Sequence, residues 1–381
     1  MATPHALNVA IIGGGGFMGR AHSLAWSLAS QQNTSGSRIR KAVLVERDLG
    51  IAEELAGQYD WDEAADDWKR VIDRDDIHIV DVVTPPQLHA EIVCYALERG
   101  KHVLCEKPLA NTSADVERML DAARTSSGRT AIGFNYRHNA AIQYAAHLVA
   151  SGEIGEVLQA RFEYHQDDAF GDMGWRRHKA SGGSGASSDI GSHVIDMADF
   201  IVGDIISVNA QLTTTASGPE DDHDVDDGGA FLARFAGGAL GVFSFSQKSW
   251  GNFAHFRFEI DGTKGGLTFD WNARDVLRVY RGRHDEFGQG GFVATPVAGG
   301  APGVWFGSTS LGTGYLDASA NMMAAFIDAV ADGRDPSGNL LHGAKIQSIV
   351  DAVWRSADAN ADSGSDSGST WESPRYPVAV G

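Results

Sequence analysis

The chain has 381 residues and a formal net charge of −19. A chain of this length exceeds one comfortable core, so two domains are expected, and the negative field opposes a nucleic-acid or anionic-membrane partner. No segment approaches the ~20 continuous apolar residues of a membrane span, and no basic region followed by a long apolar stretch marks a signal peptide. We therefore expect a cytoplasmic protein.

The first third of the chain alternates short apolar strands with helices. Strands are expected at residues 7–12, 42–45, 77–83, 102–105 and 130–134, and helices at residues 17–28, 49–59, 66–72, 89–99 and 113–123. This alternation indicates parallel strands with helical crossovers on both faces of the sheet. We predict an α/β protein with an N-terminal dinucleotide-binding Rossmann domain over residues 1–135.

The pattern changes after residue 135. Strands are expected at residues 155–165, 207–214, 229–235, 239–247, 254–261, 265–269 and 276–280, with helices at residues 188–201, 318–331 and 343–357. Closely spaced strands without crossovers predict a mostly antiparallel sheet. Residues 136–381 are therefore expected to form a C-terminal α+β domain that binds the substrate.

A glycine-rich turn directly follows the first strand and opens the first helix. It reads Gly14-x-Gly16-x-x-Gly19, in which the first glycine permits a tight turn and the second lets the backbone approach a diphosphate at the helix N-terminus. Gly19 lets helix and strand pack closely. The same pattern occurs in flexible turns, but the strand before it and the helix after it favour a dinucleotide.

An acidic residue, Glu46, ends the second strand. A carboxylate there accepts hydrogen bonds from the adenosine ribose hydroxyls and repels a 2′-phosphate, which favours NAD over NADP. The neighbouring Arg47 could instead hold that phosphate, stack on adenine, or be a solvated surface charge. The gap from Gly19 to Glu46 exceeds the usual ~20 residues, and a polar loop at residues 30–38 accounts for the excess.

Polar residues and prolines end the next two strands. Thr84-Pro85 follows the third strand and Glu106-Lys107-Pro108 follows the fourth. Ligands of open parallel sheets bind at the carboxyl edge, so these segments are expected near the nicotinamide. Each proline is also an ordinary strand terminator.

A carboxylate and an imidazole lie four residues apart in the helical stretch after residue 188. Asp189 and His193 therefore share one helix face. A histidine with a carboxylate partner is the usual general base or acid near neutral pH, although Asp189 could simply cap the helix and His193 could be a core residue. Lys107, already expected beside the cofactor, favours the catalytic interpretation.

Together these motifs resemble the Gfo/Idh/MocA oxidoreductase family over about residues 7 to 358. The resemblance is carried by the glycine turn, Thr84-Pro85-x-x-x-His89, Glu106-Lys107-Pro108, Asn135-Tyr136-Arg137 and Gly183-Ser184-Gly185…Asp189-x-x-x-His193. It implies a C-terminal domain with a large open antiparallel sheet, which often serves as an interface in a homodimer or homotetramer. It is similar to the branch of sugar and polyol dehydrogenases, which includes levoglucosan and inositol dehydrogenases.

The resemblance also implies roles for individual residues. Lys107 would touch the nicotinamide ribose and the substrate hydroxyl, with a cis peptide bond before Pro108, and Asp189 and His193 would contact the reacting hydroxyl. The candidate catalytic residues are Lys107, Asp189 and His193. The candidate cofactor-binding residues are Gly14, Gly16, Phe17, Met18, Gly19, Glu46, Arg47, Thr84, Pro85, His89, Glu106, Lys107, Asn135, Trp175 and Arg176, and the candidate substrate-binding residues are Lys107, Tyr136, Gln166, Arg176, Asp189 and His193.

Three other features of the sequence give weaker indications of function. The basic run Arg176–Lys179 could clamp a carboxylate or sulfonate on the substrate, or be a surface loop. The acidic run Asp221–Asp227 begins like a calcium loop but lacks the glycine and the final glutamate, so no metal site is expected. His22 is expected to be structural.

The sequence thus predicts an NAD-dependent dehydrogenase that oxidises a hydroxyl of a sugar, an anhydrosugar, a sugar derivative or a polyol. Two alternatives share the scaffold. One is a glycoside hydrolase that oxidises its substrate transiently, and the other is a non-enzymatic protein that senses the cofactor. A reductase running in the opposite direction also fits, because sequence does not fix the direction.

Overall fold

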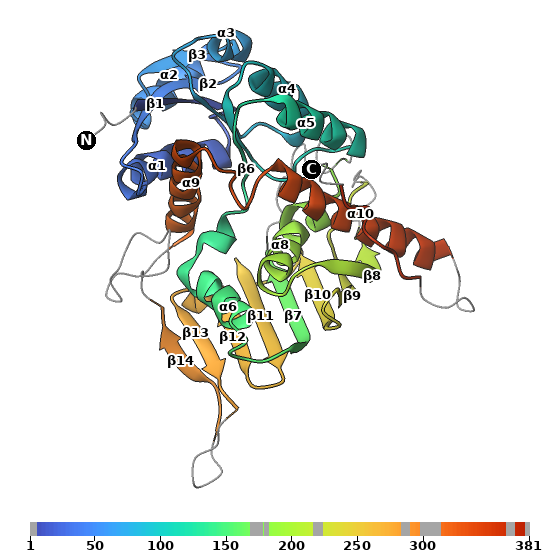
Figure 1. Cartoon of the computed structure of the whole chain (residues 1–381). Helices are drawn as coiled ribbons and strands as arrows, with labels where there is room; N and C mark the ends of the chain where they lie inside the picture. Colours follow the sequence, from blue (N-terminus) through green and yellow to red (C-terminus); the bar gives the residue numbers. More distant parts are fainter. Residues whose placement is uncertain are drawn as a thin grey trace. The chain divides into compact units, whose positions relative to one another are not determined.

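The computed structural model describes residues 6–167, 178, 183–215, 224–282, 290–297, 314–362 and 370–377. The chain divides into two compact units (Figure 1). The first contains Met1–His138 and Gly314–Ala344, and the second contains Asn139–Thr313 and Lys345–Gly381. The prediction placed all of residues 136–381 in the second domain, whereas the segment from Gly314 to Ala344 belongs to the first unit.

The first unit is built on a six-stranded sheet in the order β3-β2-β1-β4-β5-β6, in which all pairs are parallel. Its strands are β1 (Ala6–Ile12), β2 (Arg38–Val45), β3 (Glu63–Ala65), β4 (Ile79–Val82), β5 (His102–Cys105) and β6 (Thr130–Ile132). The strand order reverses at β1, so the crevice at the carboxyl ends of β1 and β4 is the expected ligand site. The five predicted strands are confirmed. The edge strand β3 was missed, because its three residues form no apolar run.

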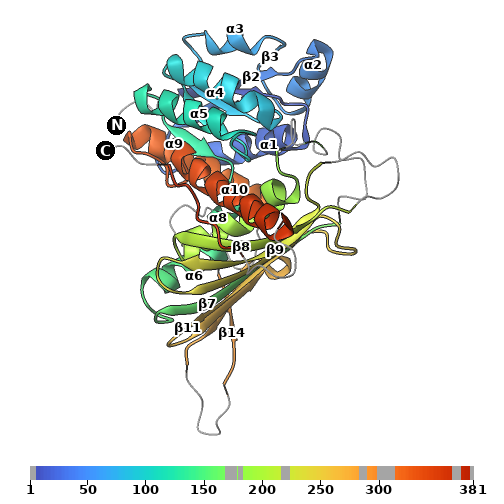
Figure 2. The same ribbon diagram turned by 90° about the vertical axis from the view of Figure 1, so that its right-hand side faces the viewer.

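Helices cover this sheet. They are α1 (Phe17–Gln32), α2 (Leu49–Gln58), α3 (Trp68–Ile72), α4 (His89–Glu98) and α5 (Ser113–Thr125), with short 3₁₀ turns at Pro86–Leu88 and Asn135–His138. Helices α4 and α5 lie side by side (Figure 2). Helix α1 continues to Gln32, four residues beyond its predicted end. Its polar last turn carries no apolar signal, but Gln32 itself is buried.

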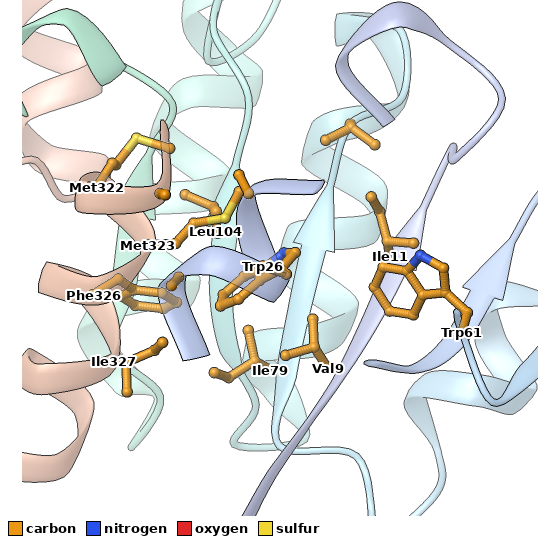
Figure 3. Close-up of a cluster of buried hydrophobic side chains, with 14 of the residues drawn as sticks. Val9, Ile11, Trp26, Trp61, Ile79, Leu104, Met322, Met323, Phe326 and Ile327 are labelled. Atoms are coloured by element: carbon orange, nitrogen blue, oxygen red, sulfur yellow. The ribbon is translucent and has the colours of Figure 1, made fainter. Parts of the chain in front are cut away.

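A helix from the end of the chain completes the core of the first unit. Helix α9 (Tyr315–Asp332) packs against α1, and its residues Met323, Phe326 and Ile327 join Trp26 in one buried cluster (Figure 3). Phe326 is 1% exposed, and burying one such side chain contributes about 2 kcal/mol. The apolar stripe of α9 is therefore what returns this segment to the first unit.

The second unit contains an eight-stranded sheet in the order β14-β13-β12-β11-β7-β10-β9-β8. Its strands are β7 (Val157–His165), β8 (Ile205–Thr213), β9 (Gly228–Phe235), β10 (Leu240–Ser246), β11 (His255–Gly262), β12 (Gly266–Asp270), β13 (Val276–Tyr280) and β14 (Val293–Pro296). All neighbouring strands are antiparallel except β7 and β10, which are parallel. The predicted mostly antiparallel sheet is confirmed, and the exposed edge strand β14 was missed.

Side chains alternate along the strands of this sheet. Phe162 on β7, Phe243 on β10 and Phe258 on β11 are buried on one face, where their rings pack together. Helices α6 (Ala140–Ala150) and α8 (Ser192–Ile201) contact the sheet and lie in front of it in Figure 1. The long helix α10 spans Leu340–Asp362. Helix α6 was not predicted, although Asn139 caps it by accepting from the N–H groups of its first turn.

Candidate active site

The glycine turn of the first unit has the geometry that a diphosphate needs. A Cβ at Gly19 would overlap the backbone of Gly14, so only glycine lets helix α1 pack this closely on the turn. Gly13 has a φ of +94°, and its Cβ would meet Thr84 at 2.9 Å. A Cβ at Gly16 would meet nothing within 4 Å, so the described chain is open at this point. No described side chain caps α1 after Gly16, which leaves the first N–H groups of the helix for a ligand.

Glu46 closes the same turn from the end of β2. Its Oε2 accepts a hydrogen bond from the N–H of Gly15 at 2.9 Å, and its Oε1 accepts from the N–H of Arg47 at 2.8 Å. The carboxylate is half-buried beside the glycine turn. It therefore lies where an acid selects the ribose of NAD in a Rossmann domain.

Two buried polar atoms at the carboxyl ends of β4 and β6 have no hydrogen-bond partner within the described part of the chain. They are the hydroxyl oxygen Oγ1 of Thr84, which can donate or accept, and the amide oxygen Oδ1 of Asn135, which can accept. Buried polar atoms are rarely left in this state, because each unmade hydrogen bond costs about 1–3 kcal/mol. Both positions were predicted to bind the cofactor, and a bound dinucleotide fits this surplus of polar atoms.

Four predicted residues of this edge, Phe17, Met18, Asn135 and Tyr136, contact α9. Tyr315 packs on Phe17 at 6.4 Å between ring centroids, and its hydroxyl lies 3.5 Å from the sulfur of Met18. Phe17 is 73% exposed. Tyr136 is buried with its ring 5.9 Å from that of Tyr315, and Asn135 Nδ2 donates to Ser319 at 2.9 Å. The segment after β6 is thus fixed by α9, a contact that the sequence did not predict.

Lys107 follows β5 on a turn held by its neighbour. Glu106 is buried, and its Oε2 accepts from the backbone N–H of Lys107 at 3.1 Å. A Cβ at Gly133 would overlap the Glu106 carboxylate, so glycine is needed there. The Lys107–Pro108 peptide bond is cis, as the family resemblance implied. The Lys107 side chain is half-exposed at this edge of the sheet.

A buried ion cluster lies behind this turn. His22 on α1 is fully buried, with Nδ1 2.9 Å from Asp81 Oδ2 and Nε2 3.1 Å from Glu106 Oε1, and Trp26 donates to Asp81 at 2.7 Å. Burial works to lower the pKa of His22, but the two carboxylates outweigh it and raise the pKa to about 10. The cationic ring therefore joins the helix that opens at the glycine turn to the strand end that carries Lys107, which is a structural role.

His89 holds two strand ends together. It is buried, with Nε2 2.8 Å from the carbonyl oxygen of Thr84 and Nδ1 3.0 Å from that of Pro108. Burial lowers its pKa, so the ring is neutral at neutral pH and donates to one of these carbonyls at a time. Its two ring nitrogens thus face the backbone at both predicted nicotinamide segments.

In the second unit, Asp189 and His193 lie on consecutive turns. The helix predicted from residue 188 begins with a single π turn, Ser187–Gly191, which continues directly into α8. His193 is 5% exposed, and its ring centroid lies 6.0 Å from that of Tyr164 on β7. Gln166, a predicted substrate-binding residue, donates to the Tyr164 hydroxyl at 2.9 Å. These side chains gather where β7 ends.

Two residues of this cluster were missed by the sequence analysis. Gln247, just after β10, donates from Nε2 to Asp189 Oδ2 at 2.7 Å. Asp226 is buried and accepts from both the N–H and the hydroxyl of Ser187 at 2.8 Å. Burial raises the pKa of Asp226 to about 8. The sequence analysis considered Asp226 only as part of the acidic run, and no local pattern revealed that its side chain is buried.

Some predicted residues lie outside the described part of the chain. They are Trp175 and Arg176, with most of the basic run, and residues 221–223 of the acidic run. The described His178 is exposed, 4.0 Å from Asp224. Among the described residues, no helix is long and apolar enough to cross a bilayer, and no three His, Cys, Asp or Glu side chains form a metal-binding group.

Comparison with known proteins places this architecture in a family. Residues 7–134 match the model of an oxidoreductase family with an NAD-binding Rossmann fold, and residues 142–268 match the GFO/IDH/MocA C-terminal domain. Levoglucosan dehydrogenase from Pseudarthrobacter phenanthrenivorans is 36% identical over 378 residues, covering 92% of this chain and 96% of that protein.

Solved structures give the same result. A levoglucosan dehydrogenase in complex with NADH and levoglucosan aligns with a TM-score of 0.89 and 34% identity, covering 97% of this chain and 100% of that one. An oxidoreductase domain protein from Kribbella flavida aligns with a TM-score of 0.88 and 35% identity, covering 98% and 100%. The glycine turn, the Glu106-Lys107-Pro108 strand end and the full-length similarity together establish that the chain belongs to the Gfo/Idh/MocA family of NAD-binding oxidoreductases.

Proposed function

We propose that this enzyme oxidises one hydroxyl of a sugar, an anhydrosugar, a sugar derivative or a polyol to the ketone, with NAD as the hydride acceptor. The observation that carries the proposal is the arrangement of one sheet edge, where the glycine turn, Glu46 and Lys107 all follow parallel strands. Full-length similarity to a levoglucosan dehydrogenase supports a sugar-like substrate.

The residues of the first unit would hold the cofactor. The open backbone at Gly16 and the N-terminus of α1 suit the diphosphate, and Glu46 suits the adenosine ribose. The unsatisfied atoms of Thr84 and Asn135 supply further polar contacts. When bound at these residues, the nicotinamide would supply the redox chemistry as the hydride acceptor.

The proton is handled by protein side chains. We assign His193 as the base that accepts the hydroxyl proton, and Asp189 as the carboxylate that orients it. The ammonium group of Lys107 stabilises the developing alkoxide. Lys107 belongs to the first unit, and Asp189 and His193 belong to the second.

A substrate panel tests this function directly. Purified enzyme is incubated with monosaccharides, anhydrosugars, inositols and anionic sugars, each with NAD or NADP, while the absorbance of the reduced cofactor is followed. We expect NADH to accumulate with at least one neutral sugar or polyol, and kcat/KM to be higher with NAD because Glu46 repels a 2′-phosphate.

The other outcomes identify the alternatives. Cleavage of a glycoside without net formation of NADH would indicate a glycoside hydrolase that oxidises its substrate transiently. Turnover of anionic sugars alone would favour a substrate carboxylate or sulfonate bound by the basic run Arg176–Lys179. Tight NAD binding without turnover of any compound would contradict the proposal and favour a cofactor-sensing protein.

We further propose that the enzyme is a cytoplasmic homodimer or homotetramer that associates through the open face of the second sheet. Side chains on that face alternate with the buried ones and include Leu232, 40% exposed, and the ion pair of Arg161 with Asp261 at 2.9 Å. Val242 lies among them on the central strand β10. An extended apolar and charged face of this kind suits a self-complementary interface.

Val242→Arg is therefore expected to lower the mass measured by light scattering to that of a monomer, because a charge is buried without a partner. The matched control is Leu49→Arg, which places the same charge on an exposed apolar residue of the first unit. A monomeric wild type, or a Val242→Arg variant with the wild-type mass, would contradict the proposed interface.

A further inference from the structure

Gln247 is a buried amide beside the carboxylate of Asp189. It directly follows β10 and is 5% exposed. Its Nε2 donates to Asp189 Oδ2 at 2.7 Å, and its backbone N–H donates to the carbonyl oxygen of Asp227 at 2.9 Å. The contact joins a strand end to a helical turn 58 residues away in the sequence. Burying a polar side chain in this way is costly unless its hydrogen bonds are made.

The chemistry of this contact fixes the state of one carboxylate oxygen. An amide N–H can only donate, so Oδ2 acts as its acceptor and the contact favours Oδ1 as the site of any proton on this carboxyl group. Glutamine also stays neutral at every pH. It therefore orients the carboxylate without competing for a proton.

The backbone under Asp189 is held by other residues. Ser187 donates from its N–H to Asp226, and its hydroxyl accepts from Trp354 Nε1 at 2.9 Å. The N–H of Asp189 donates to the carbonyl oxygen of Gly185 at 2.9 Å. Loss of the Gln247 amide is therefore expected to remove one hydrogen bond from the Asp189 carboxylate while the turn itself stays in place.

We propose that Gln247 is a positioning residue that sets the orientation and the protonation site of Asp189. The inference rests on the proposed function, in which Asp189 orients the base His193. Neither residue type nor spacing in the sequence marks Gln247. Titratable groups on the elements packed around this turn include Tyr164 and His165 on β7, His193, Asp196 and Asp199 on α8, and Asp226, Asp227 and Lys248 beside β9 and β10.

The test compares Gln247→Met and Gln247→Glu with wild type. Methionine keeps the volume of the side chain but cannot donate a hydrogen bond. Because a small misplacement of a catalytic group lowers the rate strongly, we expect kcat to fall about 100-fold with the Kd for NAD unchanged. Glutamate brings a second carboxyl group against Asp189, and the pair shares one proton near neutral pH. The acidic limb of the kcat/KM profile should then move up by about one pH unit or more.

A measurement without substrate separates this inference from the proposed function. Because the paired carboxyls of Gln247→Glu bind more protons when folded, its melting temperature should fall from pH 5 to pH 8 relative to Gln247→Met. The control is Gln211→Glu, which adds the same charge at an exposed position on β8. If that fall occurs in a protein that oxidises no sugar or polyol, the positioning contact stands and the proposed function fails.

Two results would overturn the inference. One is wild-type kcat with an unmoved pH profile in both Gln247 variants of an enzyme that does oxidise a sugar. The other is a melting profile of Gln247→Glu that runs parallel to that of Gln211→Glu, since an uncoupled carboxyl would then replace the amide.

Discussion

Lys107→Ala is expected to lower kcat by about 10²–10⁴-fold while NAD binding stays within a few-fold of wild type. The variant removes the ammonium group that stabilises the alkoxide. It keeps the backbone N–H of residue 107, which donates a hydrogen bond to the Glu106 carboxylate, and it leaves the contact of Glu106 with His22 intact. The strand end should therefore fold normally. Steady-state kinetics on a sugar from the substrate panel, with a calorimetric titration of NAD, measures both effects.

The matched control is Lys69→Ala. Lys69 is an exposed lysine of the same unit, paired with Glu91 at 3.0 Å on the surface. A surface ion pair of this kind contributes little to stability, so the variant is expected to have wild-type kinetics. Normal turnover by Lys107→Ala would refute the catalytic assignment, and an equal loss of NAD affinity and kcat would make Lys107 a cofactor-binding residue only.

Asp226→Asn is expected to become progressively more stable than wild type as the pH rises from 5 to 8. Burial is the reason that Asp226 is neutral, because it outweighs the hydrogen bonds from Ser187, which favour the ionised carboxylate. The Ser187 hydroxyl lies 2.6 Å from the carbonyl oxygen of Ser184 and 2.8 Å from Asp226 Oδ1, and it accepts from Trp354. Its single proton serves only one of the two oxygens at a time, so the hydroxyl stabilises an ionised Asp226 only in part.

The direction of this change in stability follows from the pKa values of Asp226 in the folded and unfolded states. In the folded protein, burial raises the pKa of Asp226 from 3.8 to about 8. Between these values the folded state binds the proton and the unfolded state has lost it, so the free energy of unfolding falls as the pH rises. The slope approaches about 1.4 kcal/mol per pH unit, or on the order of 4 kcal/mol between pH 5 and pH 8, and it levels off above pH 8.

Asparagine reproduces the neutral side chain at every pH, with an amide that can donate to Ser187. Urea unfolding of Asp226→Asn and wild type at pH 5, 6, 7 and 8 measures the difference. Asp224→Asn, at an exposed acid of the same run, is the control and should show no comparable slope. A constant difference between Asp226→Asn and wild type would mean that Asp226 is ionised in the folded protein throughout this range.

Local sequence patterns predicted the elements on which the candidate site depends. Apolar runs broken by Thr84-Pro85 and Glu106-Lys107-Pro108 identified strand ends, because proline and polar residues end a buried strand wherever it lies. The glycine turn could be predicted for a similar reason, since glycine is required at residue 19 by its close approach to the backbone of Gly14, only five residues away. Short-range sterics act on neighbouring residues, so the sequence records them directly.

What the sequence could not show were contacts between distant segments. Phe326 of α9 packs with Trp26 in the first unit, although some 300 residues separate them. The residues of α9 alone do not indicate which part of the chain the helix packs against. The edge strands β3 and β14 are short and polar or exposed, so they give no apolar run to detect.

By itself, then, the sequence determined the two kinds of sheet, the dinucleotide turn and the residues Lys107, Asp189 and His193 as candidates. Only the tertiary structure decided that Gln247 meets Asp189 and that Asp226 is buried against Ser187. The reason is physical. Hydrophobic periodicity and turn sterics act over a few residues, whereas burial of a particular polar group depends on which distant strands come to lie beside it.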